Sequence, residues 1–199
     1  YYQSAAFDDG IHVSVTFDHV CYCRAGRAIL DDVSFSFGFS EKVAILGGSG
    51  AGKTTVLKLI MGLIRPDSGT IAIDSQRVND KSEEELRTFR SRFGVVFQEG
   101  ALFDSLTVGE NVAFPMREAG ERDHRVLERK VLELLDDVGI GHAVGFMPDE
   151  LSGGMRRRVA IARALAKTDT RMFLYDEPTG GLDPVNAANI CGLIARLAE

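Results

Sequence analysis

The sequence lacks a long apolar run, an excess of positive charge and a framework of cysteines. None of its apolar runs approaches the ~20 residues that a helix needs to cross a bilayer, and the N-terminal residues show no signal-peptide pattern. The formal net charge of −6 argues against broad nucleic-acid binding, which needs a clustered basic surface. We therefore expect any membrane role to be peripheral, and no nucleic acid among the partners.

Cysteine is scarce and unpatterned. Cys21, Cys23 and Cys191 are an odd set with no Cys-x-x-Cys pair, which is typical of a reducing cytoplasm. Cys21 and Cys23 lie two apart in a strand-like stretch and so face the same side; a metal pair is an alternative that no further cysteine or histidine cluster supports. The 199 residues, 45% apolar and 26% charged, predict a soluble globular domain with an embedded subdomain.

A glycine-rich stretch at residues 47–54 organises the rest of the chain. It has the P-loop pattern of a glycine, four free positions, Gly-Lys and a hydroxyl residue. The apolar run at 42–46 predicts a buried strand before it, and apolar residues at helical spacing predict a helix over 54–64. Loop N–H groups and the positive end of that helix would bind phosphate oxygens. An ordinary glycine-rich surface turn is the alternative.

The roles expected of this stretch differ from residue to residue. Lys53 is expected to reach the β- and γ-phosphates of a nucleotide. The Thr54 hydroxyl is expected to bind Mg²⁺, a hard ion that prefers oxygen ligands. The predicted nucleotide contacts here are Gly47, Gly48, Ser49, Gly50, Ala51, Gly52, Lys53, Thr54 and Thr55.

Apolar and alternating patterns predict strands on both sides of the P-loop. Two β segments precede it, which suggests an antiparallel sheet attached to a parallel one. Strand, P-loop, helix and returning strand together predict an α/β domain with its ligand at the carboxyl ends of the strands. The predicted strands are 11–17, 29–39, 42–46, 70–74, 94–97 and 172–175, and the predicted helices after the P-loop are 82–93, 126–138, 152–165 and 184–197.

Two carboxylates follow the apolar strand at residues 172–175. Asp176, at the end of such a strand, can hold Mg²⁺, usually through water. Glu177 points differently and suits a base that orients and deprotonates an attacking water. Alone, an Asp-Glu pair after a strand favours a solvated turn. Together with a P-loop earlier in the chain, it predicts the second half of a nucleotide site.

A second phosphate-type cradle opens the helix predicted at 152–165. Ser152 is a candidate N-cap, and Gly153 and Gly154 leave bare N–H groups at the positive helix end. Because the P-loop already surrounds the phosphates, we expect this cradle to cover the γ-phosphate from a second subunit. The three arginines at 156–158 are expected to form a solvated face with partner contacts rather than a nucleic-acid patch.

These motifs together resemble the nucleotide-binding subunit of ABC transporters over about residues 11 to 199. The motifs are 47–54, Gln98, 151–155, 173–177 and 181–184. The resemblance implies an α/β P-loop NTPase (ABC ATPase) core with an antiparallel β-subdomain, formed by 11–97 and 168–199, and an inserted α-helical subdomain at 98–167. It also implies a peripheral protein at the cytoplasmic face of the inner membrane.

The resemblance further implies ATP and Mg²⁺ as cofactors and a head-to-tail homodimer with two ATP molecules between opposite motifs. On that basis Tyr22 stacks on adenine, and Gln98 senses Mg²⁺ and water. Asp183 lies in a loop across the dimer, while Ser152, Gly153 and Gly154 act in trans. The catalytic residues are then Glu177, Gln98 and Lys53, and the metal ligands are Thr54, Gln98 and Asp176.

A narrower resemblance appears at residues 98–108 and 110–115, with Met155 where most relatives have glutamine. This combination is similar to the ATPase of MCE-associated, Mla-type phospholipid transport systems. It implies membrane permease subunits and an MCE-type lipid-binding protein as partners. The alternatives are an ABC ATPase for another substrate, a non-transport ABC protein, or a regulatory module with degenerate chemistry.

One departure from the family concerns histidine. The family carries a histidine that contacts the γ-phosphate, on a strand end after the final helix. The four histidines here are His12, His19, His124 and His142, and none follows Glu177. We therefore expect a C-terminally truncated chain that binds nucleotide but hydrolyses it weakly.

Overall fold

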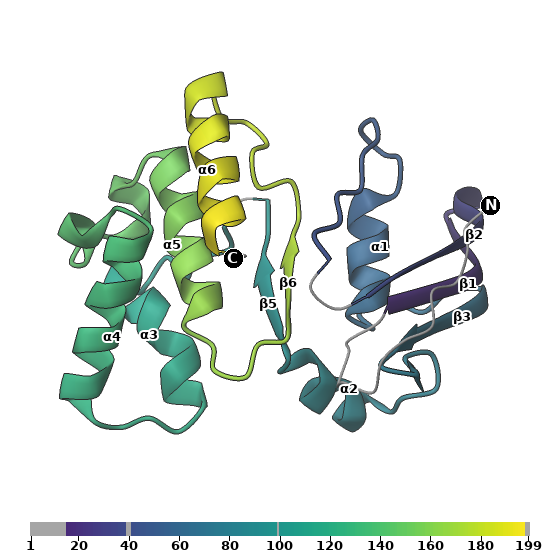
Figure 1. Cartoon of the computed structure of the whole chain (residues 1–199), viewed down its shortest axis with the longest axis horizontal. Coiled ribbons are helices and arrows are strands. Elements are labelled where there is room, and N and C mark those ends of the chain that lie inside the picture. The colour runs from purple at the N-terminus through teal and green to yellow at the C-terminus, as the bar shows by residue number, and fades with distance from the viewer. Residues whose placement is uncertain (1–14, 39–40, 99, 198–199) are drawn as a thin grey trace. The chain divides into compact units, whose positions relative to one another are not determined.

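A computed structural model describes residues 15–38, 41–98 and 100–197 (Figure 1). The chain divides into two compact units, one ending at Leu86 and the other beginning at Arg87, and each is described by itself. Residues 11–14 of the first predicted strand and Phe39 of the second lie outside the described residues.

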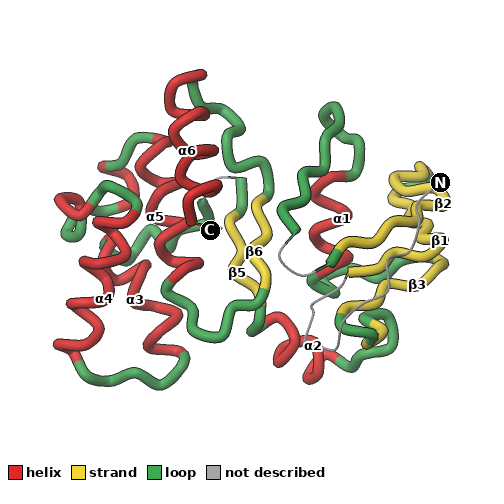
Figure 2. The backbone as a smooth tube through the Cα atoms, in the orientation of Figure 1, coloured by secondary structure: helices red, strands yellow, loops and turns green. Residues whose placement is uncertain are grey.

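The first unit contains the predicted antiparallel sheet (Figure 2). Strands β1 (Val15–Arg24), β2 (Arg27–Phe37), β3 (Ser68–Ile73) and β4 (Gln76–Arg77) lie in the order β2-β1-β3-β4, and every neighbouring pair is antiparallel. The first strand extends well past residue 17, as far as the turn at Ala25 and Gly26. Side chains buried on one face of this sheet form the core of the unit: Val15, Phe17, Val20, Ile71 and Ile73.

A bulge at His19 lets β1 keep its apolar residues on the buried face. The pairing register shifts between Phe17 and Val20, and His19 has a positive φ of 49°. The extra residue moves the side-chain alternation by one position, so Val20 is buried although it lies three residues after Phe17.

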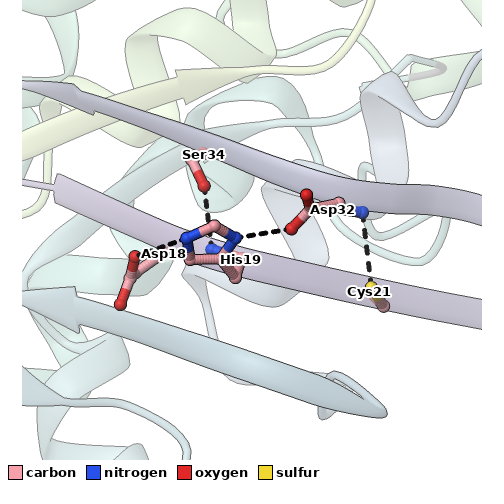
Figure 3. Close-up of polar contacts among 5 residues, drawn as sticks. All are labelled: Asp18, His19, Cys21, Asp32 and Ser34. Carbon is pink, nitrogen blue, oxygen red and sulfur yellow. Dashed lines mark hydrogen bonds and ion pairs between the residues drawn. The ribbon is translucent and has the colours of Figure 1, made fainter.

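Polar contacts join this bulge to β2 (Figure 3). Nδ1 of His19 lies 2.6 Å from a carboxylate oxygen of Asp32, its Nε2 lies 3.9 Å from Asp18, and its backbone N–H donates to Ser34 Oγ at 2.9 Å. The hydrogen bond to Asp32, and then the negative charges of Asp32 and Asp18, raise the pKa of His19 above 6.5. The backbone N–H of Asp32 donates to Cys21 Sγ at 3.3 Å.

The helix after the P-loop is α1 (Lys53–Ile60), which buries Val56, Leu59 and Ile60. It ends four residues earlier than the apolar spacing predicts. Gly62 has a φ of +63° and its N–H donates to the Leu59 carbonyl at 3.0 Å, while the N–H of Leu63 donates to the Lys58 carbonyl at 2.9 Å. This paired arrangement is the Schellman motif, which stops a helix at a glycine.

The strand predicted at residues 42–46 is wrong. Residues 41–48 form no helix or strand in the structure, and Val43 and Leu46 are 51% and 90% exposed. A parallel strand that is buried on both faces depends on neighbouring strands for its hydrogen bonds. Among the described residues, the strands of this unit pair only within the antiparallel sheet. Residues 42–46 therefore have no parallel strand in this unit with which to form hydrogen bonds.

The second unit contains a parallel strand pair, β5 (Phe93–Val96) and β6 (Met172–Tyr175). Helices α3 (Val108–Glu118), α4 (His124–Asp137), α5 (Gly153–Leu165) and α6 (Pro184–Leu197) complete it, with short 3₁₀ turns at Gly141–Ala143 and Pro148–Glu150. Helix α5 packs against α3, α4, α6 and β5, as Figure 1 allows the reader to follow. The strand predicted at 172–175 and the start of the last helix at Pro184 are confirmed, and the strand predicted at 94–97 is found one residue earlier.

Capping residues define where these helices begin. Ser82 and Glu85 exchange hydrogen bonds before α2 (Glu83–Arg90), and Thr107 and Glu110 do the same at α3. Asp123 caps α4, which therefore starts two residues before the predicted apolar stripe. Of the helices that the structure describes, none is both long enough and apolar enough to span a membrane.

Candidate functional site

The predicted P-loop lies between residue 46 and α1 in the first unit. Gly52 is the N-cap of α1 with a φ of 93° and a ψ of 5°, and Gly50 has a φ of 79°. A Cβ atom at Gly52 would lie 3.1 Å from Cδ2 of Leu30 and 3.3 Å from Cγ2 of Ile29. Positive φ and the close approach of β2 together require glycine at position 52.

Lys53 folds back over the loop that precedes it. Its Nζ donates to the carbonyl oxygens of Gly47 at 3.0 Å and Gly48 at 2.9 Å. The N–H of Val56 makes the first hydrogen bond of the helical pattern, to Gly52 at 2.9 Å, so the amides of Lys53, Thr54 and Thr55 belong to the first turn. The loop, the ammonium group and the positive helix end thus converge, which is the arrangement that binds phosphate.

Tyr22 is placed at the same end of the β1–β2 hairpin as this loop. It is half-buried in β1 and pairs in register with Leu30 of β2. A Cβ atom at Gly52 would also lie closer to the side chain of Leu30 than to that of any other residue. Tyr22 is therefore paired with a residue of β2 that lies close to the predicted phosphate loop.

The second unit brings Asp176 and Gln98 to the same end of the parallel strands. Val96 pairs with Tyr175 in register, and the backbone N–H of Asp176 donates to the Val96 carbonyl at 2.9 Å. The Asp176 side chain is largely buried, with 8% of the residue exposed, whereas Gln98 is exposed two residues beyond Val96. The carboxylate and the amide thus follow two hydrogen-bonded strand ends.

Glu177 begins a tight turn rather than continuing the strand. Its φ is +47°, which is uncommon for a residue with a side chain. Its carbonyl accepts a hydrogen bond from the N–H of Gly180 at 3.0 Å, and a Cβ atom at Gly180 would lie 3.5 Å from Oε2 of Glu177. The turn therefore packs against the carboxylate predicted to act as the base.

Ser152 caps α5 as predicted. Its Oγ accepts a hydrogen bond from the N–H of Met155 at 3.2 Å, and Gly153 and Gly154 form the first turn. Cβ atoms at these two glycines would lie 3.5 Å from Leu182 and 3.4 Å from Asn186. The glycine-rich start of α5 thus packs beside the segment that leads into α6.

Asp183 has a local structural role at that segment. Its carboxylate accepts hydrogen bonds from the N–H groups of Val185 and Asn186, each at 3.1 Å, and from the side-chain amide of Asn186 at 2.6 Å. The hydrogen bond from the Asn186 amide, and then those from the backbone, lower the pKa of Asp183. Asp183 therefore caps α6, a role that the motif alone did not indicate.

The prediction that the arginines at 156–158 form a solvated face is wrong. Three consecutive helical residues span most of the helix circumference, so they cannot share one face. Arg156 donates to the Leu151 carbonyl, and Arg158 donates to the Val138 carbonyl. Arg157 is 6% exposed and donates to the carbonyls of Glu177 at 2.8 Å and Gly180 at 2.5 Å.

Sequence reasoning also missed two side chains that hold the loop after Gln98. Arg163 donates to the carbonyls of Gly100 and Ala101, each at 2.8 Å, and burial lowers its pKa. Asn111 is fully buried, donates to the carbonyls of Phe103, Leu106 and Thr107, and accepts from the N–H of Phe103. A polar residue inside the apolar stripe of α3 was the only signal in the sequence for Asn111.

Metal binding by cysteine receives no support from the geometry. Cys21 is half-buried with its sulfur engaged by Asp32, and Cys23 is exposed. Within residues 15–38, 41–98 and 100–197, no group of three or more His, Cys, Asp or Glu side chains is arranged to hold a metal ion.

Comparison with known proteins identifies the family. The ABC transporter family profile matches residues 30–180. The chain is 42% identical over 181 residues to the intermembrane phospholipid transport system ATP-binding protein MlaF of Haemophilus influenzae, covering 91% of this chain and 68% of that protein. It is 41% identical to MlaF of Escherichia coli K12, covering 89% of this chain and 66% of that protein.

A second group of relatives carries a different name. The chain is 43% identical over 182 residues to a probable ribonucleotide transport ATP-binding protein, mkl, of Mycobacterium tuberculosis, covering 92% of this chain and 50% of that protein. The chain thus spans about two thirds of the length of the MlaF proteins and half that of mkl.

Solved structures agree with the sequence matches. The dimeric post-hydrolysis state of the ATP-binding cassette MJ0796 bound to ADP and Pi has a TM-score of 0.82 and 34% identity, covering 93% of this chain and 83% of that one. CbiO1 from Clostridium perfringens, part of an ABC transporter complex, has a TM-score of 0.80 and 29% identity, covering 92% and 73%. The predicted fold class and both predicted resemblances, to ABC ATPases and to the Mla type among them, are confirmed. This chain belongs to the ABC transporter family, as one of its ATP-binding cassettes.

Proposed function

We propose that this chain binds and hydrolyses ATP and that it drives phospholipid transport together with a membrane permease. The observation that carries the proposal is that one chain holds both the Lys53 loop, in the first unit, and Asp176, Glu177 and the Ser152 helix start, in the second. The local geometry of each of these elements supports its proposed role. The MlaF relatives, which are named for phospholipid transport, support the choice of substrate class.

ATP contacts divide between the loop and the hairpin of the first unit. Lys53 exchanges its two carbonyl partners for phosphate oxygens, and the amides of residues 47–55 cradle the same phosphates. Tyr22 contacts the adenine from β1. The closeness of the Lys53 ammonium to two loop carbonyls supports this role, because the ammonium already lies within the curve of the loop.

Mg²⁺ fits the chemistry of the residues present, since the proposed ligands Thr54, Gln98 and Asp176 each offer a side-chain oxygen. A largely buried carboxylate such as Asp176, placed at a strand end, matches the preference of a hard ion. When bound, Mg²⁺ supplies charge stabilisation to the transferred phosphoryl group. Gln98 orients water, and Glu177 accepts its proton.

A head-to-tail homodimer completes the proposed site. Ser152, Gly153 and Gly154 of one copy face the γ-phosphate held by the other, and Asp183 lies close to that start of α5 through its neighbours Leu182 and Asn186. The dimeric state of the MJ0796 cassette structures supports this arrangement. The helical segment 98–167 contacts the permease at the cytoplasmic face of the inner membrane, with an MCE-type lipid-binding protein in the same complex.

A different transported molecule is the second candidate. The similarity to mkl, whose name refers to ribonucleotide transport, is the observation that favours it. The two candidates share the same ATPase chemistry and differ only in the permease and its cargo. Mass spectrometry of small molecules that co-purify with the full-length protein and its permease separates the two: a phospholipid supports the first candidate, and a ribonucleotide other than ATP or ADP supports the second.

The catalytic assignment is tested with a matched pair of substitutions in the full-length protein. Lys53→Ala should raise the Kd for ATP by about 10- to 100-fold, because a charge-assisted contact contributes ~1.5–3 kcal/mol. Glu177→Gln should leave ATP binding intact, reduce turnover by about 10²–10⁴-fold and accumulate an ATP-bound dimer in size-exclusion chromatography. Tight ATP binding by the Lys53 variant, or normal turnover by the Glu177 variant, contradicts the assignment.

A polypeptide of these 199 residues alone is expected to bind ATP and to hydrolyse it weakly. None of its histidines follows Glu177, so it supplies no histidine of its own to the γ-phosphate at the position where the family has one. Measuring phosphate release by this polypeptide beside a longer relative tests the expectation. Equal rates would contradict it.

A further inference from the structure

Arg157 is a buried charge whose guanidinium contacts are directed at the segment that follows β6. Charged side chains are rarely this buried unless they are paired or hydrogen-bonded. Only 6% of the residue is exposed, and its two terminal nitrogens donate to two carbonyls of one short turn, those of Glu177 and Gly180. A planar fork that spans two carbonyls fixes their relative position more firmly than a single donor does.

The turn that Arg157 holds contains an uncommon backbone conformation. Glu177 has a φ of +47°, and such conformations persist only where the surrounding structure stabilises them. The Glu177 carbonyl accepts two hydrogen bonds, from Arg157 and from the N–H of Gly180. Because the backbone sets the direction of the Cα–Cβ bond, these bonds also fix the position from which the Glu177 carboxylate extends.

We infer that Arg157 is a positioning residue for Glu177, and the inference rests on the proposed function of Glu177 as the base. Arg157 lies on α5, one turn after Gly154, and α5 begins at the Ser152 cap. The orientation of the base is therefore tied to the helix whose first turn faces the nucleotide of the partner subunit. Helix α5 thus takes part in two events. Its first turn closes on the nucleotide of the partner subunit, and its Arg157 places Glu177 at the nucleotide of its own subunit.

The first test compares Arg157→Met with Arg158→Met in the full-length protein. Arg158 lies on the same helix and donates to the Val138 carbonyl, so its variant controls for the loss of a guanidinium from α5. A displacement of ~1 Å at a reacting group can reduce the rate by about 100-fold. We expect Arg157→Met to lower kcat by about 100-fold with KM for ATP within a factor of about three, and Arg158→Met to leave kcat unchanged.

A conservative variant protects the test against misfolding. Arg157→Lys retains the charge but has no planar fork, so we expect a kcat between those of the wild type and Arg157→Met. Thermal melts of all variants are recorded beside the kinetics. If Arg157→Met does not fold, Arg157→Lys decides: a lowered kcat at unchanged KM supports the inference, and an unchanged kcat overturns it.

The ATP-trapped dimer separates positioning from general support of the fold. In the double variant Arg157→Met/Glu177→Gln, we expect the dimer to form at the same ATP concentration as in Glu177→Gln alone, since Arg157 acts on the base and not on nucleotide binding. Loss of the dimer would overturn the inference, because Arg157 would then support the Ser152 cradle itself. Absence of ATPase activity in the wild type would instead reject the proposed function.

Discussion

Three glycines of the P-loop differ in backbone conformation and surroundings. Their alanine variants therefore test the loop conformation and its packing against β2. Gly48 has no positive φ and open space at its Cβ position. Gly50 has a φ of +79° and open space, and Gly52 has a φ of +93° with Leu30 and Ile29 at 3.1 and 3.3 Å. The three sites thus separate backbone strain from close packing against β2.

The expected losses follow from these two terms. A left-handed conformation costs a residue with a Cβ about 1–2 kcal/mol. Overpacking of a closely packed site typically adds about 1–3 kcal/mol. We therefore expect the free energy of unfolding to change by less than about 0.5 kcal/mol in Gly48→Ala, to fall by about 1–2 kcal/mol in Gly50→Ala, and to fall by about 2–5 kcal/mol in Gly52→Ala.

Urea denaturation followed by far-UV circular dichroism measures the series, since the sequence has no tryptophan to report by fluorescence. All three variants gain the same restriction of the unfolded chain, which cancels when they are compared with one another. The order of stability, Gly48→Ala above Gly50→Ala above Gly52→Ala, is the informative result. A Gly52 variant as stable as the Gly50 variant would refute the packing of the loop against β2.

Two further predictions concern the β1–β2 bulge and the start of α5. The raised pKa of His19 means that its contact with Asp32 contributes stability that is fully present below about pH 6.5 and is lost as the pH rises through the folded-state pKa. NMR titration should place the His19 midpoint above 6.5 and show Asp32→Asn returning it toward that value; a midpoint at or below 6.5 in the wild type would reject the contact. Ser152→Arg should preserve ATP binding by the monomer but block the ATP-dependent dimer of Glu177→Gln, because a bulky cation would replace the cap beside Gly153. A normal dimer in that background would reject the trans role of Ser152.

Local sequence patterns predicted the elements whose signals are local. The P-loop and the helix after it were expected from Gly52, Lys53 and the apolar spacing, and the Ser152 cap from a hydroxyl residue before two glycines. The strand at 42–46 failed because a parallel strand depends on neighbours that its own residues do not encode. Gly62 marks the early end of α1, but the prediction followed the apolar periodicity and extended the helix past this glycine.

The arginine side chains that donate hydrogen bonds to loops of the site could not be predicted from the sequence, for a physical reason. Arg157 and Arg163 donate to carbonyls that are 20 or more positions away, and every residue has a carbonyl, so no sequence pattern marks the acceptor. The bulge at His19, by contrast, could have been found from the sequence. Val15, Phe17 and Val20 change from a spacing of two to a spacing of three, which a continuous strand accommodates only with an extra residue.

The arginines of α5 donate hydrogen bonds to the main chain of neighbouring segments. Arg156, Arg157, Arg158 and Arg163 all donate to backbone oxygens, at Leu151, at Glu177 and Gly180, at Val138, and at Gly100 and Ala101. Substitution at a receiving position such as Ala101 or Val138 therefore removes no acceptor, whereas substitution of the arginine removes the bond. Substitution of a donor arginine should accordingly lower the stability of these contacts through loss of the bond itself, whereas substitution of an acceptor residue acts through the packing or chemistry of its side chain, as at the buried Val138.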